Sequence, residues 1–243
     1  ENCHSLESIN IPDSVTSIRC DTFRSCDSLT SVDIPDSVTS MGSSAFGSCK
    51  SLTSVVIPNS VTSMGSSAFE NCHSLESINI PDSVTSIEGF AFENCQRLKH
   101  INIPDSVTHI RDSAFESCYS LKNINIPDSV THIGDSAFNY CESLTSVRIP
   151  NSVTSIGRNA FGDCYQLTSV TVVMGKGAAD ALCLLMLAAT AKSNKDSTFR
   201  SLFTPKTSGF IGASVKSFLV DRDINPGLLQ GLKANGLCWE MVF

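Results

Sequence analysis

The chain has 243 residues, of which 41% are hydrophobic and 17% charged, so it can bury a core and is not a disordered polar chain. Its net charge of −7 argues against a protein that is held on nucleic acid by general basicity. The longest apolar stretch, residues 181–189, is far shorter than the roughly 20 residues needed to cross a bilayer.

Cysteine recurs along the first two thirds of the chain at a constant spacing. Eight of the eleven cysteines follow a step of 23 residues: Cys3, Cys26, Cys49, Cys72, Cys95, Cys118, Cys141 and Cys164. Leucine, proline and phenylalanine keep the same step, which defines seven complete repeat units and the start of an eighth. Residues 1–18 and 70–87 are identical, which indicates duplication of units.

Each unit predicts two short strands and a tight turn. Residues 75–80 end in an alternation of apolar and polar side chains typical of a half-buried strand, and Pro81 ends it because proline has no amide donor. The Pro-Asp-Ser sequence favours a turn, and residues 84–87 are predicted as a second extended segment. Phe69 and Cys72 are three residues apart, which predicts one helical turn that directs both side chains inward.

A unit of this size cannot bury its apolar side alone, so the units are expected to stack as turns of a solenoid with interior ladders of like residues. The periodic cysteines are then predicted to be reduced, buried thiols, with some disulfides as an alternative. Structural zinc is disfavoured because no close pair of cysteines occurs. Cys20 lies outside the ladder and is predicted to be exposed and reactive.

The repeat pattern ends after Val170, and a segment of different charge follows. Residues 1–171 carry 9 Lys or Arg and 19 Asp or Glu (9 − 19 = −10), whereas residues 172–243 carry 8 and 5 (8 − 5 = +3). We expect a solenoid over residues 1–173 and a mixed, mainly helical segment over residues 174–243. This segment is interpreted as a cap of the last turn or as a truncated domain.

Helices are predicted at residues 178–191 and about 226–234, whereas residues 208–220 are ambiguous. Both ends of the chain indicate a piece of a longer product, since the first residue lies inside a repeat and the last residues are apolar.

The repeat, written L-x-x-I-x-I-P-x-S-V-T-x-I-G-x-x-A-F-x-x-C, resembles the BspA-like (Treponema pallidum-type) leucine-rich repeats over about residues 1–171. The resemblance implies a β-rich, curved, right-handed solenoid with a binding face. Known members are mostly surface proteins that act in adhesion, so it also implies a protein ligand and a cell-surface or secreted location. It does not indicate which ligand is bound, because the shared residues belong to the core.

Recognition is expected from the strand positions that the repeat leaves free. The predicted concave binding face consists of Asn10, Asp33, Val56, Asn79, Asn102, Asn125 and Arg148, together with His100 and Asn123. The asparagines among them would form a row of stacked amides. Phe90 stands where other units have a small polar residue and is a candidate hot spot for binding.

No catalytic site, metal site or cofactor is predicted. Asp105, Ser106 and His109 lie in one unit, but the Asp-Ser pair recurs as turn chemistry, so the nearby histidine is interpreted as coincidence. His109 and His132 occupy equivalent positions and are expected to stack about 5 Å apart. Without a third ligand, a solvated pair is favoured over a metal site.

The sequence therefore predicts a non-catalytic leucine-rich-repeat scaffold that binds a protein or glycan, with surface adhesion as the role the resemblance implies. One alternative is a regulatory or receptor-like region of a larger protein whose catalytic domain lies outside this chain. Another is a structural module that self-associates through an exposed strand at the end of the solenoid. No nucleic-acid partner is predicted.

Overall fold

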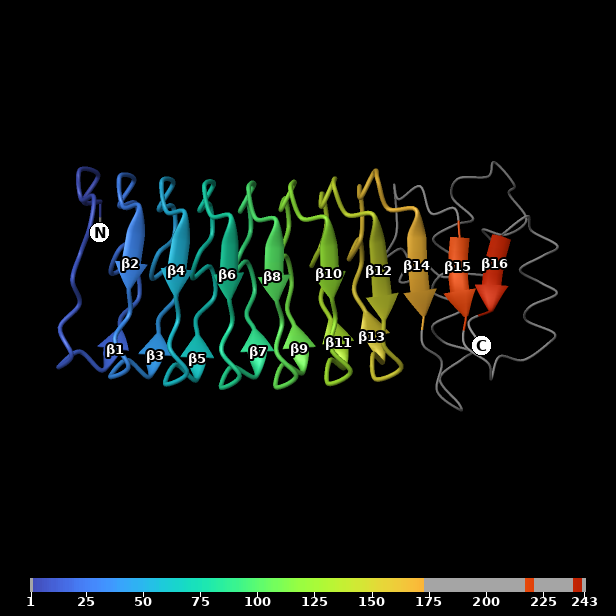
Figure 1. Ribbon diagram of the computed structural model, residues 1–243, viewed down its shortest axis with the longest axis horizontal. Helices are drawn as coiled ribbons and strands as arrows, with labels where there is room; N and C mark the ends of the chain where they lie inside the picture. Colours follow the sequence, from blue (N-terminus) through green and yellow to red (C-terminus); the bar gives the residue numbers. More distant parts are fainter. Residues whose placement is uncertain (1, 173–216, 221–237, 242–243) are drawn as a thin grey trace.

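The computed structural model describes residues 2–172, 217–220 and 238–241, which form a parallel β-solenoid (Figure 1). Each turn places a longer strand on one side and a two-residue strand on another, as the repeat unit predicts. Most repeat strands pair in parallel with the equivalent strand 23 residues away, for example Ser77 with His100 and Asn79 with Asn102, and the ladder is interrupted between some turns. The sequence period is therefore the length of one turn.

The longer strands alternate buried and outward-facing residues, and all but the last of them lie just before the proline of their unit. They are β2 (Ser31–Asp33), β4 (Ser54–Val56), β6 (Ser77–Asn79), β8 (His100–Asn102), β10 (Asn123–Asn125), β12 (Ser146–Ile149) and β14 (Ser169–Val172). In β8, for instance, Ile101 points into the core while His100 and Asn102 point outward. Proline then ends the strand because it offers no amide donor.

The shorter strands follow the Pro-Asp-Ser turn and confirm the second extended segment. They are β1 (Ser17–Ile18), β3 (Ser40–Met41), β5 (Ser63–Met64), β7 (Ser86–Ile87), β9 (His109–Ile110), β11 (His132–Ile133) and β13 (Ser155–Ile156). Their Ile or Met is buried in each case. The two sets of strands thus supply opposite walls of one apolar interior.

Two further strands extend the sheet of longer strands beyond β14. Strand β15 (Ser217–Val220) pairs with β14, and β16 (Cys238–Met241) pairs with β15, both in parallel. The helices predicted at residues 178–191 and 226–234 lie outside the described residues. The parts of the segment 174–243 that the structure describes are these two strands, and no helix occurs in the described chain.

The helical turn predicted around phenylalanine and cysteine is wrong. The amide of Cys72 does donate to the carbonyl of Phe69 at 3.3 Å, as in a tight helix. However, Ser67 and Asn71 have φ angles of 59° each, in the left-handed region, whereas a helix needs negative φ throughout. The segment is a series of tight turns, and the predicted inward orientation of Phe69 and Cys72 is confirmed because both are fully buried.

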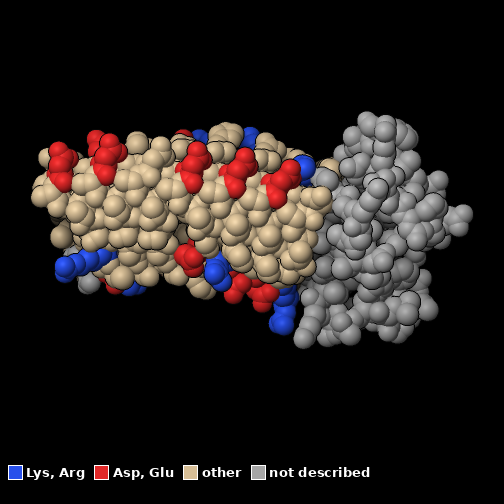
Figure 2. Space-filling view, turned by 90° about the horizontal axis from the view of Figure 1, so that it is seen from below, with Lys and Arg blue, Asp and Glu red and all other residues tan. Residues whose placement is uncertain are grey.

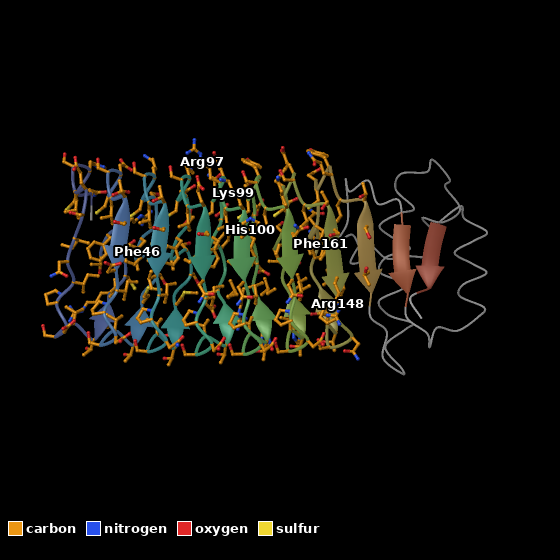
Figure 3. All side chains as sticks on the ribbon, viewed as in Figure 1. Phe46, Arg97, Lys99, His100, Arg148 and Phe161 are labelled. Carbon is orange, nitrogen blue, oxygen red and sulfur yellow. The ribbon has the colours of Figure 1, made fainter. Side chains whose placement is uncertain are left out.

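Phenylalanine forms a stacked ladder through the interior. Neighbouring rings from Phe23 to Phe161 have centroids 5.1–5.7 Å apart and are nearly parallel. Figure 3 labels Phe46 and Phe161, the first and last fully buried rings of the ladder. Offset stacking at this distance is favourable beyond the burial of apolar area.

The cysteines of the repeat form a second ladder of free thiols. Seven of the eight periodic cysteines are buried, from Cys26 to Cys164, and the nine cysteines within residues 2–172 are all reduced thiols. The prediction fails only for Cys3, which is exposed because no described turn covers it on its N-terminal side. Cys20 is exposed, as predicted.

Candidate binding surface

The exposed residues of the longer strands form one continuous outer surface, here called the long-strand face. All nine residues of the predicted binding face lie on it: Asn10, Asp33, Val56, Asn79, His100, Asn102, Asn123, Asn125 and Arg148. They are exposed except for Arg148, which is partly buried. Val56 is the apolar exception, with 67% of its surface accessible.

Asparagine side chains lie along the middle of this face. Asn79 in β6 is in direct register with Asn102 in β8, and Asn125 stands at the equivalent position of β10. Their side-chain amides have no hydrogen-bond partner among the residues that the structure describes. Each amide therefore offers both a donor group and an acceptor to a partner.

Four basic residues gather where the chain enters β8 and β10: Arg97, Lys99, His100 and Lys122, here called the basic cluster. All four are exposed, and Figure 3 shows Arg97, Lys99 and His100 descending from the loop onto β8. The ammonium group of Lys99 lies 2.9 Å from the carboxylate of Glu76. This hydrogen bond lowers the pKa of Glu76. Sequence reasoning selected only His100 from this cluster.

Aspartates border the long-strand face along the turns that follow the prolines. The row consists of Asp13, Asp36, Asp82, Asp105 and Asp128, all exposed. Figure 2, viewed from the side of these turns, shows acidic side chains in a line along the solenoid. Arg148 reaches this row and pairs with Asp128 at 2.8 Å. The row gives the edge of the face a negative charge opposite in sign to the basic cluster.

The predicted histidine stack lies on the side of the shorter strands. The rings of His109 and His132 are 4.8 Å apart and nearly parallel, at 9°. They line a shallow hollow of about 300 Å³, with Asp112 and Asp135 nearby. Each of these aspartates accepts a hydrogen bond from a backbone amide of the next turn. No group of three or more His, Cys, Asp or Glu side chains suited to a metal ion occurs in the described part of the chain.

The Asp, Ser and His of one unit are not arranged for catalysis. The hydroxyl of Ser106 donates to the backbone carbonyl of Val84 at 2.6 Å, as equivalent serines do in other turns. His109 is instead bonded through Nδ1 to the hydroxyl of Thr108 at 2.8 Å. These serines therefore connect consecutive turns.

Phe90 lies away from the long-strand face, in the tight turns after β7. Its surface is 43% accessible and its φ of 60° is left-handed, which is rare for a bulky side chain. Sequence reasoning missed three further exposed aromatic residues: Tyr119, Tyr140 and Tyr165. They flank the periodic cysteines, at positions where the residue type varies between units. This variation could have identified them from the sequence as exposed residues.

A parallel solenoid whose 23-residue turns each carry two short strands around a ladder of buried leucines defines a leucine-rich repeat protein. The sequence profile described as the BspA type leucine rich repeat region, with six copies, matches residues 1–122 and 62–176. The chain therefore belongs to the BspA-type leucine-rich repeat family. The proteins of this family are general binding or surface scaffolds, which agrees with the coarse prediction of a repeat scaffold.

Two solved structures are similar to the chain. A leucine-rich repeat protein from Bacteroides ovatus shares 29% identity with a TM-score of 0.70, over 100% of this chain and 56% of that protein. A leucine-rich cell surface protein from Faecalibacterium prausnitzii shares 25% identity with a TM-score of 0.50, over 94% of this chain and 62% of that protein. This chain thus spans less than two thirds of either relative.

No curated protein sequence matches the chain significantly. Within the residues that the structure describes, no helix has the length and apolar character needed to cross a membrane.

Proposed function

We propose that the chain is a non-catalytic scaffold that binds a protein partner on the long-strand face. The observation that carries the proposal is the row of Asn79, Asn102 and Asn125, whose amides are exposed and unpaired within the described residues. The ladders beneath hold the backbone of these strands rigid, so a partner would meet polar groups that need little ordering on binding.

Adhesion at a cell surface is the role we propose for this binding. The Faecalibacterium relative carries the description of a cell surface protein, and family membership points the same way. The exposed, polar character of the face favours a broad contact with a protein over the enclosure of a small molecule, since small-molecule sites are usually concave and largely apolar.

The test is capture of extracellular matrix proteins by the immobilised chain, with and without changes to the asparagine row. The triple variant Asn79→Ala, Asn102→Ala and Asn125→Ala removes the amides but leaves the buried strand residues intact. The control variant Ser63→Ala and Ser155→Ala changes exposed residues of the shorter strands. We expect the triple variant alone to weaken capture at least tenfold. Equal capture by both variants, or capture of no panel member by the parent chain, would contradict the proposal.

A further inference from the structure

We propose that the basic cluster and the asparagines beside it bind an acidic polysaccharide, one whose sugar units carry sulfate or carboxylate groups as well as hydroxyls. This inference goes beyond the proposed function, because it adds an acidic polysaccharide as a second ligand for part of the same long-strand face. It concerns the turns of β8 and β10 only.

Unneutralised positive charge is unevenly distributed over the solenoid. Residues 1–171 carry nine Lys or Arg against nineteen Asp or Glu. Five of these cations form ion pairs in the structure: Arg24, Lys50, Lys99, Arg111 and Arg148. Of the four without an acidic partner among the described residues, Arg97 and Lys122 both belong to the basic cluster. Half of these unpaired cations thus lie in one cluster of an otherwise acidic solenoid.

The cationic side chains of the basic cluster are closely spaced. Lys99 and Lys122 occupy equivalent positions just before β8 and β10, which are neighbours but belong to separate sheets, so their backbones are roughly 5 Å or slightly more apart. Arg97 and Lys99 are two residues apart, which is at most about 7 Å along an extended chain. A linear polymer with closely spaced negative charges can therefore contact several of these side chains at once.

The ion pair of Lys99 with Glu76 does not prevent this role. The side chains of Lys99 and Glu76 are 49% and 50% accessible, so water and salt screen the pair strongly. Exposed pairs of this kind contribute little to stability, and an incoming sulfate or carboxylate can replace Glu76 as the partner of Lys99. Lys122 and Arg97 need no such exchange.

Exposed asparagines beside the basic cluster favour a polysaccharide over an acidic protein segment as the ligand. Asn102, Asn123 and Asn125 are exposed beside the cluster, with no side-chain hydrogen bond inside the described structure. An amide offers two donor hydrogens and an acceptor oxygen, which suits a hydroxyl because a hydroxyl both donates and accepts. Tyr119, 37% accessible, lies in the loop before β10 and offers an amphipathic ring at the same rim. The surface thus offers groups for the hydroxyls of a sugar as well as for its charge.

The test measures binding of dextran sulfate to the full chain by calorimetry in about 0.15 M salt, with neutral dextran and polyglutamate as comparison polymers. The cluster variant carries Arg97→Ser, Lys99→Thr and Lys122→Thr. Other turns already have serine or threonine at the equivalent positions, as in Ser120 and Thr145, so these substitutions fit the fold. The control variant carries Arg19→Gly, Arg111→Gly and Arg158→Ser. Glycine and serine likewise occur at the equivalent positions of other turns. Both variants lose three positive charges, so net charge is matched.

We expect dextran sulfate to bind, the cluster variant to lose about tenfold in affinity through lost counterion release, and the control variant to lose less than twofold. Binding of polyglutamate as tight as that of dextran sulfate would overturn the inference, as would no binding or equal losses in both variants. If matrix proteins are still captured through the asparagine row while dextran sulfate fails to bind, only this inference falls. If capture also fails, the proposed function falls with it.

Discussion

The thiol of Cys95 donates a hydrogen bond to the backbone carbonyl of Phe69 in the preceding turn, with an Sγ to O distance of 3.2 Å. The same bond recurs from Cys49 to Cys164, always to the phenylalanine 26 residues earlier and at 3.0–3.3 Å. Each thiol therefore fills apolar space and also connects two turns. Cysteine at this position is a structural residue of the repeat.

Replacing Cys95 with alanine should destabilise the solenoid by about 1–3 kcal/mol, because it opens a small cavity and removes the bond to Phe69. Cys20→Ala is the matched control, since Cys20 is exposed and its loss should change stability by at most about 0.5 kcal/mol. The measurement is the urea concentration at half-unfolding. Equal midpoints for the two variants would show that the buried thiol contributes nothing.

The solenoid should lose stability in alkaline solution. Burial raises the pKa of Cys49 and of Cys164 to about 12, whereas an unfolded thiol ionises near about 8.5. Because the folded pKa is the higher one, the stabilising contribution is complete below about pH 8.5 and is lost as the pH rises toward 12. Each such thiol lowers stability by up to about 1.4 kcal/mol per pH unit in that window.

This pH dependence is measured from urea midpoints at pH 7.5, 9 and 10 under reducing conditions. The double variant Cys49→Ala and Cys164→Ala lacks two of the titrating groups, so its stability should fall less steeply with pH than that of the parent chain. An unchanged slope would mean that these thiols are not protected from ionisation in the folded state.

The interior of this fold could be predicted from the sequence because stacking forces equivalent residues into equivalent places. Cys72 and Phe69 repeat every 23 residues, and both are fully buried, as predicted. The backbone between them could not be predicted in the same way. Serine and asparagine tolerate the left-handed conformation, and Ser67 and Asn71 adopt it, but the spacing of Phe69 and Cys72 is equally compatible with a helical turn.

The candidate binding surface was only partly predictable for a related reason. Alternation within a strand predicts that Asn102 points outward, and it does. The basic cluster depends on Arg97, in the loop before β8, and on Lys122, whose significance comes from lying beside Lys99 of the neighbouring turn. Neither residue belongs to a motif within its own unit. The relation between them appears only when turns are stacked and ion pairs are assigned.

Substitution with alanine should lower stability strongly at Phe92 and hardly at all at Phe90. Phe92 is fully buried in the aromatic ladder, so Phe92→Ala should cost about 3–5 kcal/mol. Phe90 is exposed, and alanine keeps the Cβ atom that makes its left-handed φ unfavourable, so Phe90→Ala should change stability by at most about 0.5 kcal/mol. Thermal or urea unfolding of both variants tests this pair. A large loss of stability in Phe90→Ala would contradict this prediction, because it would mean that the exposed ring makes stabilising contacts.

The stacked histidines should both carry their neutral-state proton on Nδ1. The hydroxyl of Thr108 donates its one hydrogen to the backbone carbonyl of Thr85 at 3.2 Å, so toward His109 it can only accept. The Nδ1 of His109 must then be the donor. Thr131 and His132 repeat this arrangement, with distances of 3.1 and 2.7 Å.

Nitrogen-15 NMR above pH 8 distinguishes the two tautomers by the chemical shifts of the ring nitrogens. We expect the Nδ1–H form for His109 in the parent chain and a shift toward the Nε2–H form in Thr108→Val, which keeps the shape of the side chain but removes the acceptor. His132, held by Thr131, serves as the internal control and should not change. If His109 is already in the Nε2–H form in the parent chain, then its Nδ1 accepts from Thr108, and the Thr108 hydroxyl does not bond to Thr85.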